Sequence, residues 1–268
     1  MEKENHIMKK EVMLMAAGLC MALAAGCAGP QGNDAGKPQP KEERVLTVGT
    51  DPAFPPFSYY QGQTRAYTGF DVELIDAVAK TAGYTRTEFV SADMKDLLDG
   101  LNAGRYDAVI SCLSITDERK AQAAFTRPYA HSGYVAVTAR GTTLSSPEDL
   151  ANRKISVKAG SVAESMAHAL SANVEPCATA EDALRHVVSG SSDVLLSDRY
   201  MAAYFAANGY GQDIAIQSGV DLKVPSDLAI AVRKEDAALL DVLNAGLATF
   251  MDTPEYNQLK KSYFGDYL

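Results

Sequence analysis

Hydrophobic and polar residues follow two alternating periods from residue 45 onward. The run VLTVGT at 45–50 is rich in β-branched residues and predicts a strand. Apolar residues recur at helical spacing over 71–83, and a closing glycine predicts the end of a helix there. The pattern continues with a second strand, a helix and a third strand, at 87–91, 93–104 and 107–113. It resumes with a strand at 154–158, and such alternation indicates an α/β fold with a largely parallel sheet.

Two segments of the chain resemble each other. Residues 96–111 (DLLDGLNAGRYDAVIS) align without a gap with residues 182–197 (DALRHVVSGSSDVLLS). Each predicts a helix ended by Gly and a strand whose carboxyl end carries Ser. Duplication and coincidence both explain the match. Open α/β sheets bind ligands beyond the carboxyl ends of their strands, so two such ends facing each other would form a cleft.

The N-terminal residues 1–26 are typical of a signal peptide. Lys9 and Lys10 precede an apolar run over 12–25, which is shorter than the roughly 20 residues of a membrane-spanning helix. The run closes with LAAGC, which resembles a bacterial lipoprotein box and implies that Cys27 is lipidated. An ordinary cleaved signal and a short anchor helix are the alternatives. The stretch 27–44 is rich in Pro, Gly and charge, and we expect a flexible tether.

Composition and charge narrow the possible partners. The 268 residues are 47% hydrophobic and carry a formal charge of −9, which argues against nucleic acid. The His residues show no metal-ligand spacing, so we expect neither a metal nor a cofactor. Cys112 and Cys177 could form a disulfide in an exported protein. We expect free thiols, because a bond between the two halves would oppose their movement.

Arg119 and two small hydroxyl side chains follow the strand expected at 107–113. Ser114 lies at the strand end, and Thr116 is a good N-cap for a helix whose first turn holds Arg119. A guanidinium binds a carboxylate with two parallel hydrogen bonds, and Ser114 with nearby backbone N–H groups would complete such a site. The alternative is a surface ion pair between Arg119 and the neighbouring acids.

The second half of the chain offers a complementary site. Gly160 permits close backbone approach, and Ser161 and Glu164 have capping-box spacing, so a helix with free N–H groups begins there. Asp198 follows a predicted strand and is either an N-cap or, if it faces the cleft, a partner for an ammonium. A carboxylate on Arg119 and an ammonium on Asp198 together describe an α-amino acid.

Six motifs occur in order over residues 45–268. They are TDPAFPPF (50–57), GFDVELIDAVAK (69–80), GLNAGRYDAVISCLSITDERK (100–120), FTRPYAHSGY (125–134), ISVKAGS (155–161) and SDVLLSD (192–198). On these motifs the chain resembles the polar amino acid family (family 3) of bacterial extracellular solute-binding proteins, which supply ABC importers. The resemblance implies a two-lobed periplasmic-binding-protein fold of type II. In it, two parallel-rich α/β sheets are joined by two extended hinge crossovers.

The resemblance also implies boundaries and partners. Lobe 1 would comprise 45–128 plus 229–268 and lobe 2 would comprise 134–223, with hinges at 129–133 and 224–228. A monomer would enclose a free amino acid between its lobes and deliver it to an ABC permease complex. The protein would be exported and lipid-anchored to the cell envelope, in the periplasm or on the outer face of the cytoplasmic membrane.

A set of ligand contacts follows from the same resemblance. Arg119 and Ser114 would bind the carboxylate together with the backbone near Ser161 and Val162, and Asp198 would bind the ammonium. The positions expected to contact the ligand side chain are Asp51, Phe54, Met94, Ser111, Cys112 and Lys158.

Three of these positions bear on the substrate. Met94 stands where many relatives have an aromatic residue, and Cys112 replaces a Gly or Ser. Asp51 alone favours a cationic or amide side chain, but Lys158 lies in the same region with the opposite charge. These features favour a polar, uncharged amino acid, with a basic one as second choice.

Two other functions fit the same fold. A dehydratase would use an acid near the start of the helix at 161–171, where Glu164 lies, with Lys158 or Asp198 as charge partner. Glu164 already has a role as a cap, however, and Asp198 suits an ammonium. A ligand-reporting component of a sensory system would bind a small molecule and need a partner. We therefore expect an importer's binding protein and not an enzyme.

Overall fold

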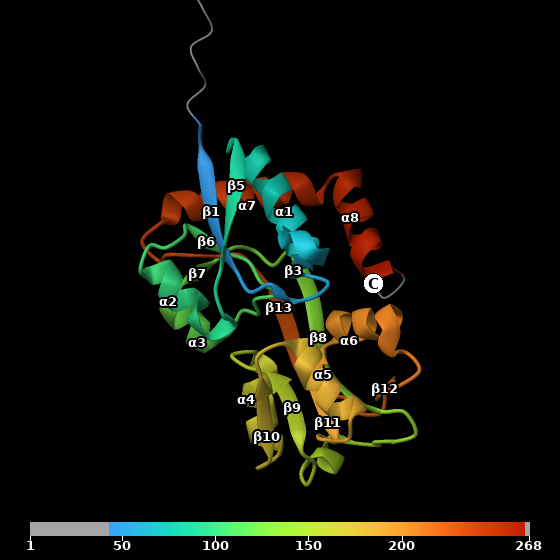
Figure 1. The fold of residues 1–268 in the computed structure, drawn as a ribbon. Coiled ribbons are helices and arrows are strands. Elements are labelled where there is room, and N and C mark those ends of the chain that lie inside the picture. The colour runs from blue at the N-terminus through green and yellow to red at the C-terminus, as the bar shows by residue number, and fades with distance from the viewer. Residues whose placement is uncertain (1–42, 266–268) are drawn as a thin grey trace, which may run out of the picture. The chain divides into compact units, whose positions relative to one another are not determined.

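Two mixed β-sheets form the framework of the protein (Figure 1). The structure is a computed structural model that describes residues 43–265. The expected signal peptide, Cys27 and all but the end of the tether lie outside these residues. The first sheet has the order β5-β1-β6-β14-β7. Its strands are β1 (Val45–Thr50), β5 (Arg86–Ser91), β6 (Ala108–Val109), β7 (Ala124–Phe125) and β14 (Ala231–Val232).

The second sheet repeats the plan of the first, in the order β10-β9-β11-β8-β12. In each sheet one strand, β1 or β9, has two parallel neighbours. One of these neighbours, β6 or β11, pairs on its other side with an antiparallel strand, β14 or β8. The segments 96–111 and 182–197 therefore hold equivalent strands, β6 and β11. The strands of this sheet are β8 (Ala130–Ala139), β9 (Ile155–Lys158), β10 (Val174–Cys177), β11 (Val194–Asp198) and β12 (Ile214–Ile216).

Helices pack on both sheets. Those of lobe 1, the part built on the first sheet, are α1 (Phe70–Thr81), α2 (Leu97–Asn102), α3 (Asp117–Gln122), α7 (Ala237–Met251) and α8 (Pro254–Phe264). Those of lobe 2, the part built on the second sheet, are α4 (Val162–Leu170), α5 (Ala180–Val188) and α6 (Arg199–Phe205). Within residues 43–265 no helix has the length and apolarity needed to cross a membrane.

The remaining elements are short. A three-stranded sheet contains β2 (Ala53–Phe54), β3 (Ser58–Gln61) and β4 (Ala66–Thr68). Single turns of 3₁₀-helix occupy η1 (Gly62–Thr64), η2 (Met94–Asp96) and η3 (Pro147–Leu150), and a π-turn, η4 (Ala206–Tyr210), follows α6. A last strand, β13 (Pro225–Leu228), pairs antiparallel with the start of β8. The hinge segments expected at 129–133 and 224–228 fall on this strand pair, and the lobe boundaries themselves stay a prediction.

The hydrophobic pattern explains the core. The apolar face predicted for 71–83 is buried in α1, with Val72, Ile75, Val78 and Ala79 at most 7% exposed. In β11, Val194 and Leu196 pack with α4 on one face of the sheet, while Leu195 points to the other face with α5. The ring of Phe264 in α8 lies 4.5 Å from that of Tyr200 in α6, so the C-terminal helix of lobe 1 also contacts lobe 2.

The strand predicted at 107–113 is wrong in length, because β6 ends at Val109. Cys112 adopts a left-handed conformation with φ 48°, which a strand cannot contain. Its N–H donates to the carboxylate of Asp71 at 2.5 Å instead of to a neighbouring strand. The chain thus leaves the sheet just before Ser114. The helix predicted at 93–104 is divided into η2 and α2.

Candidate ligand-binding site

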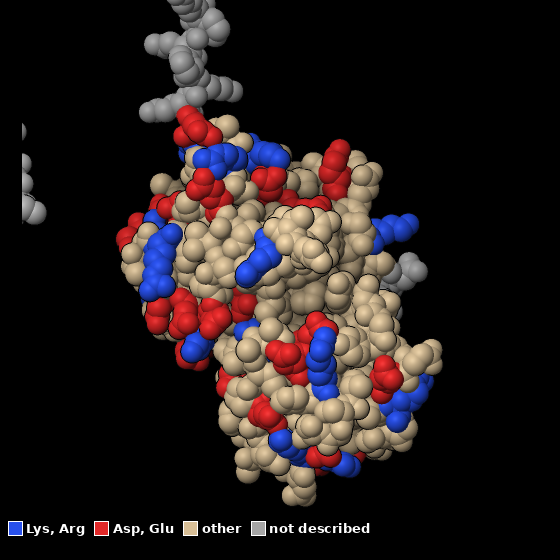
Figure 2. Space-filling view, viewed as in Figure 1, with Lys and Arg blue, Asp and Glu red and all other residues tan. Residues whose placement is uncertain are grey.

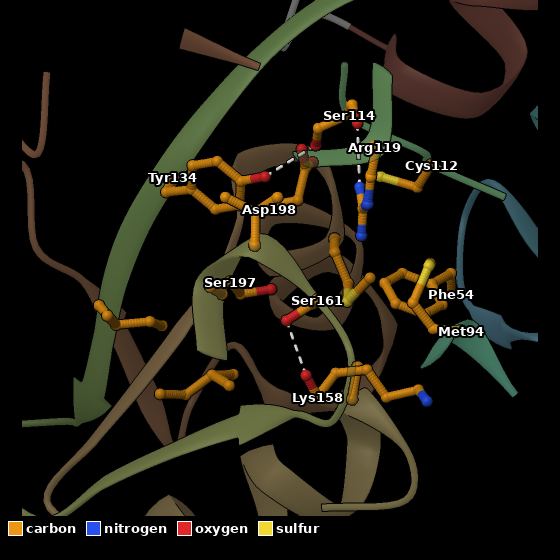
Figure 3. Close-up of a pocket in the computed structure, with 16 residues that line it drawn as sticks. Phe54, Met94, Cys112, Ser114, Arg119, Tyr134, Lys158, Ser161, Ser197 and Asp198 are labelled. Atoms are coloured by element: carbon orange, nitrogen blue, oxygen red, sulfur yellow. Dashed lines mark hydrogen bonds between the residues drawn. The ribbon is translucent and has the colours of Figure 1, made fainter. Parts of the chain in front are cut away.

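A cavity lies between the two lobes (Figure 3). The space among its lining atoms, including the part open to solvent, is about 420 Å³, but the centre of a water molecule fits in only about 30 Å³ of it. The cavity is therefore narrow. Nine predicted residues line it: Phe54, Met94, Cys112, Ser114, Arg119, Lys158, Ser161, Val162 and Asp198.

Arg119 bridges the two lobes. Its N–H donates to the Thr116 hydroxyl at 3.2 Å, which confirms Thr116 as the N-cap of α3. The guanidinium donates from Nη1 to the Ser114 carbonyl at 3.0 Å and from Nη2 to the Gly160 carbonyl of lobe 2 at 3.2 Å. Among the described residues Arg119 forms no ion pair with the neighbouring acids. Its side chain lines the cavity, and its charge is available to an anion.

Asp198 faces the same cavity from lobe 2. It caps α6, since its Oδ1 accepts the N–H of Tyr200 at 2.8 Å, so the N-cap role and the cleft-facing role hold together. Its Oδ2 is buried and has no hydrogen-bond partner among residues 43–265. Burial raises the pKa of this carboxyl to about 6. A buried carboxylate oxygen with free acceptor capacity suits a cation that brings its own donors.

Ser114 forms hydrogen bonds with both β8 and β13, the strand pair on which the expected hinges fall. Its Oγ lies 2.8 Å from the Tyr134 hydroxyl of β8 and 2.8 Å from the Ser226 hydroxyl near the start of β13. Tyr134 also lines the cavity, and we did not predict this role. The motif FTRPYAHSGY contains Tyr134, but the direction of its side chain depends on strand register, which the motif does not indicate.

The start of α4 closes another side of the cavity. Ser161 caps the helix by accepting the Glu164 N–H at 3.4 Å. The Glu164 carboxylate accepts the N–H of Gly160 at 2.6 Å, one residue before the position of a standard capping box. Glu164 is thus engaged in local structure and is not among the residues that line the cavity.

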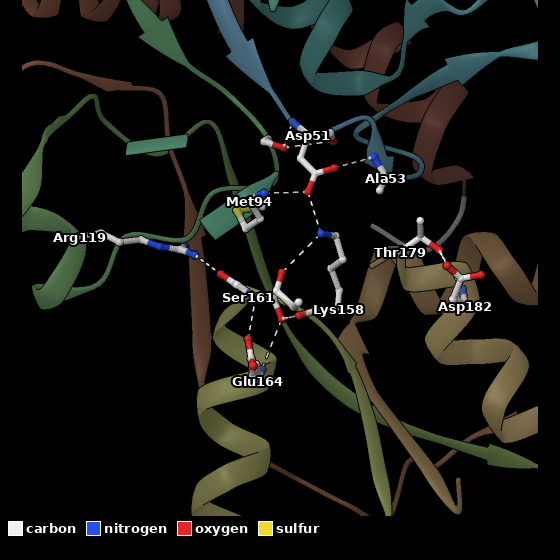
Figure 4. Close-up of polar contacts among 12 residues, drawn as sticks. Asp51, Ala53, Met94, Arg119, Lys158, Ser161, Glu164, Thr179 and Asp182 are labelled. Atoms are coloured by element: carbon white, nitrogen blue, oxygen red, sulfur yellow. Dashed lines mark hydrogen bonds and ion pairs between the residues drawn. The ribbon is translucent and has the colours of Figure 1, made fainter. Parts of the chain in front are cut away.

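Asp51 and Lys158 meet across the cleft (Figure 4). The Lys158 ammonium lies 2.8 Å from Asp51 Oδ2, and both side chains are at most 6% exposed. Neither Asp51 nor Ser111 lines the cavity, although both were predicted to contact the ligand side chain. The buried Ser111 hydroxyl accepts the Asp51 N–H at 3.0 Å. Ser111 therefore holds Asp51 in place and has no surface on the cavity.

Asp71 is a second residue that we did not predict. It is fully buried, and burial raises its pKa from 3.8 to about 7. Its hydrogen bond to the Cys112 N–H fixes the left-handed turn at the edge of the cavity. The thiols of Cys112 and Cys177 are both free. Burial raises the pKa of the Cys112 thiol well above its ordinary value, which keeps it neutral.

Metal-ligand geometry and surface charge bear on two other classes of ligand. Among residues 43–265 no group of three or more His, Cys, Asp or Glu side chains is placed to hold a metal ion. On the face drawn in Figure 2, basic and acidic side chains are intermingled, and no extended basic patch suited to nucleic acid lies there.

The family profile of bacterial extracellular solute-binding proteins, family 3, matches residues 46–266. The chain belongs to this family. It is similar to a probable histidine-binding protein of Neisseria gonorrhoeae, with 30% identity over 96% of this chain and 97% of that one. It is also similar to the arginine-binding extracellular protein ArtP of Bacillus subtilis, with 33% identity over 96% of this chain and 98% of ArtP.

Solved structures confirm the two-lobed fold. An ancestral arginine-binding protein bound to glutamine matches with a TM-score of 0.76 and 28% identity, over 84% of this chain and 100% of that one. The ancestral amino acid-binding protein AncCDT-1, a precursor of cyclohexadienyl dehydratase, matches with a TM-score of 0.74 and 30% identity, over 82% and 95%.

Gly160→Ala tests the contact between the lobes. A Cβ at this position would lie 2.7 Å from the Lys95 backbone nitrogen of lobe 1, so the two lobes could not approach as closely. We expect solute binding to weaken by about 1–3 kcal/mol, the usual cost of overpacking, in isothermal titration calorimetry. Gly190→Ala is the matched control, because Gly190 has a similar φ, 77° against 75°, and no neighbour within 4 Å of its Cβ. Equal affinities in the two variants would contradict the contact.

Asp71→Asn tests the buried carboxyl. Because the folded-state pKa of Asp71 is raised to about 7, its contribution to the free energy of unfolding is most favourable below pH 4 and declines as pH rises to 7. Asn can keep the bond to the Cys112 N–H without the charge. The stability of the wild type relative to Asp71→Asn should therefore fall by about 1.4 kcal/mol per pH unit over this range in urea denaturation. A pH-independent difference would show that Asp71 does not titrate there.

Proposed function

We propose that the protein binds a free L-amino acid, polar or basic, between its lobes and delivers it to an ABC permease in the membrane. The observation that carries this proposal is the placement of opposite charges on one cavity. Arg119 reaches it from lobe 1, and the unpartnered Oδ2 of Asp198 reaches it from lobe 2. These groups complement the carboxylate and ammonium of one zwitterion.

The relatives support this ligand class. Those reported above are named for binding histidine and arginine, and the ancestral arginine-binding protein holds glutamine. All these ligands share one α-amino acid head and differ in their side chains, as expected of a site built around Arg119 and Asp198.

Binding and closure are coupled in this mechanism. Arg119 binds the carboxylate with its fork, and the first N–H groups of α4, near Val162, add donors on the opposite side. The Ser114 hydroxyl adds a further hydrogen bond to the carboxylate, and Asp198 Oδ2 receives the ammonium. Because these groups come from different lobes, one ligand contacts all of them only when the lobes are together. The ligand therefore shifts the protein towards its closed form by bending at 129–133 and 224–228.

The dehydratase alternative has weaker support. Its expected acid, Glu164, accepts the Gly160 N–H and lies outside the cavity lining. The relatives named above are binding proteins. A ligand-reporting role would use the same site, and no contact among the described residues favours it over transport.

The protein acts outside the cytoplasm, as a member of the extracellular solute-binding proteins. We further propose that Cys27 is lipidated and that residues 27–44 tether the body to the membrane. Support comes from the LAAGC sequence and from the Pro- and Gly-rich composition that follows it.

Arg119→Lys tests the carboxylate site. A thermal-shift screen of the twenty amino acids with cystine, ornithine and prephenate first identifies the ligand. Lysine keeps the charge but loses the bidentate fork, so we expect binding to weaken by about 2–5 kcal/mol in calorimetry. Arg105→Lys, an exposed change in the same lobe, should leave affinity unchanged. Equal affinity in wild type and Arg119→Lys would refute the assignment.

Cys27→Ala tests the anchor. Without the thiol no lipid can be attached, and the protein should move from the membrane fraction to the soluble fraction of cells. Cys20→Ala, in the apolar run, is the control and should leave the protein with the membrane. A Cys27→Ala protein that stays membrane-bound would rule out lipidation at this residue.

A further inference from the structure

The ion pair between Asp51 and Lys158 spans the two lobes next to the cavity. Asp51 follows β1 in lobe 1, and Lys158 ends β9 in lobe 2. The pair is buried, with Nζ to Oδ2 at 2.8 Å. A buried pair of this kind is stable only while both partners are present, since either charge alone would lack compensation.

The carboxylate of Asp51 is already occupied by the protein. Its Oδ1 accepts the Ala53 N–H at 3.1 Å, and its Oδ2 accepts the Met94 N–H at 2.9 Å as well as the Lys158 ammonium. Lys158 itself lies 5.5 Å from the centre of the Phe54 ring, so its charge also faces an aromatic wall of the cavity. A ligand cation could reach Asp51 only by displacing Lys158.

The charged residues at the cavity therefore form two pairs, Arg119 with Asp198 and Lys158 with Asp51. Arg119 and Asp198 line the part of the cavity where we propose that the zwitterionic head binds. Figure 3 places Phe54 and Met94 on another side, away from Asp198 and towards the Lys158 ammonium. There the charges of Lys158 and Asp51 cancel, and a ligand side chain meets a thioether, an aromatic ring and the neutral Cys112 thiol.

We propose that the Lys158 ammonium occupies the position beside Asp51 that the side-chain cation of a basic ligand would otherwise take. The site therefore prefers amino acids with uncharged side chains. This inference rests on the proposed function. Because the two residues belong to different lobes, the pair also holds the lobes together when the bound ligand has an uncharged side chain. A ligand with an uncharged side chain thus leaves a contact in place that a basic ligand must break.

The experiment compares ligand preference in charge variants of the full-length protein. Calorimetry or competition gives affinities for arginine, ornithine, glutamate and the best uncharged ligand. Wild type should prefer the uncharged ligand. Lys158→Met, similar in length but neutral, exposes Asp51 and should raise the ratio of arginine affinity to uncharged-ligand affinity by at least tenfold. Lys158→Gln serves as a second variant if Lys158→Met does not fold.

The reciprocal change gives the opposite shift. Asp51→Asn leaves Lys158 without its counter-charge and should raise the relative affinity for glutamate by at least tenfold. The double variant Asp51→Asn with Lys158→Met is neutral again and should return to the uncharged ligand. Agreement of the three variants would support an electrostatic cause, because a change in pocket shape alone would not reverse with the sign of the charge.

The outcomes separate this inference from the proposed function. If wild type prefers arginine, or if Lys158→Met and Lys158→Gln keep the wild-type ratio while binding the uncharged ligand, the inference is wrong and the proposed function stands. If wild type binds no amino acid, the proposed function fails. If the ratios shift as described, both are supported.

Discussion

The opposition of Arg119 and Asp198 across one narrow cavity is the constraint on which the rest of the structure depends. Each group is charged and largely removed from water, and a charge in such a place is stable only with partners. Asp198 Oδ2 has none among the described residues, while Arg119 uses only part of its donor capacity on two carbonyls. A molecule that carries both complementary charges satisfies both lobes at once, which links recognition to closure.

The two sheets make this opposition possible. In each sheet the strand that leads to the cavity, β6 or β11, lies between a parallel neighbour and an antiparallel one. The carboxyl ends of β6 and β11 both point towards the cleft. In lobe 1 the chain then turns sharply at Cys112, held by Asp71, which brings Ser114 to the edge of the cavity. In lobe 2 the strand runs directly into α6, and Asp198 serves as cap and as ligand group together.

Much of this architecture could be predicted from short stretches of the sequence. The strand at 45–50 and the helix face of α1 follow from periodicity over a long window. Thr116, Ser161 and Asp198 cap their helices as their chemistry predicts, because capping depends on residues only two or three positions apart. The nine residues brought together at the cavity came from motif positions and not from periodicity.

The failures share one physical cause, which is dependence on contacts far apart in the chain. The strand at 107–113 was predicted too long, because its end is set by Asp71, 41 residues before Cys112. Tyr134 and Ser226 were missed because strand register aims them at Ser114. Ser111 supports Asp51 and does not line the cavity. No local pattern contains this information.

A crystal structure of the protein with its amino acid bound tests the central claim most directly. The account predicts the ligand carboxylate within hydrogen-bond distance of the Arg119 guanidinium and the ammonium within hydrogen-bond distance of Asp198 Oδ2, so that one molecule contacts both lobes. A ligand whose charged groups contact a single lobe, with Arg119 or Asp198 turned away from it, would contradict the account.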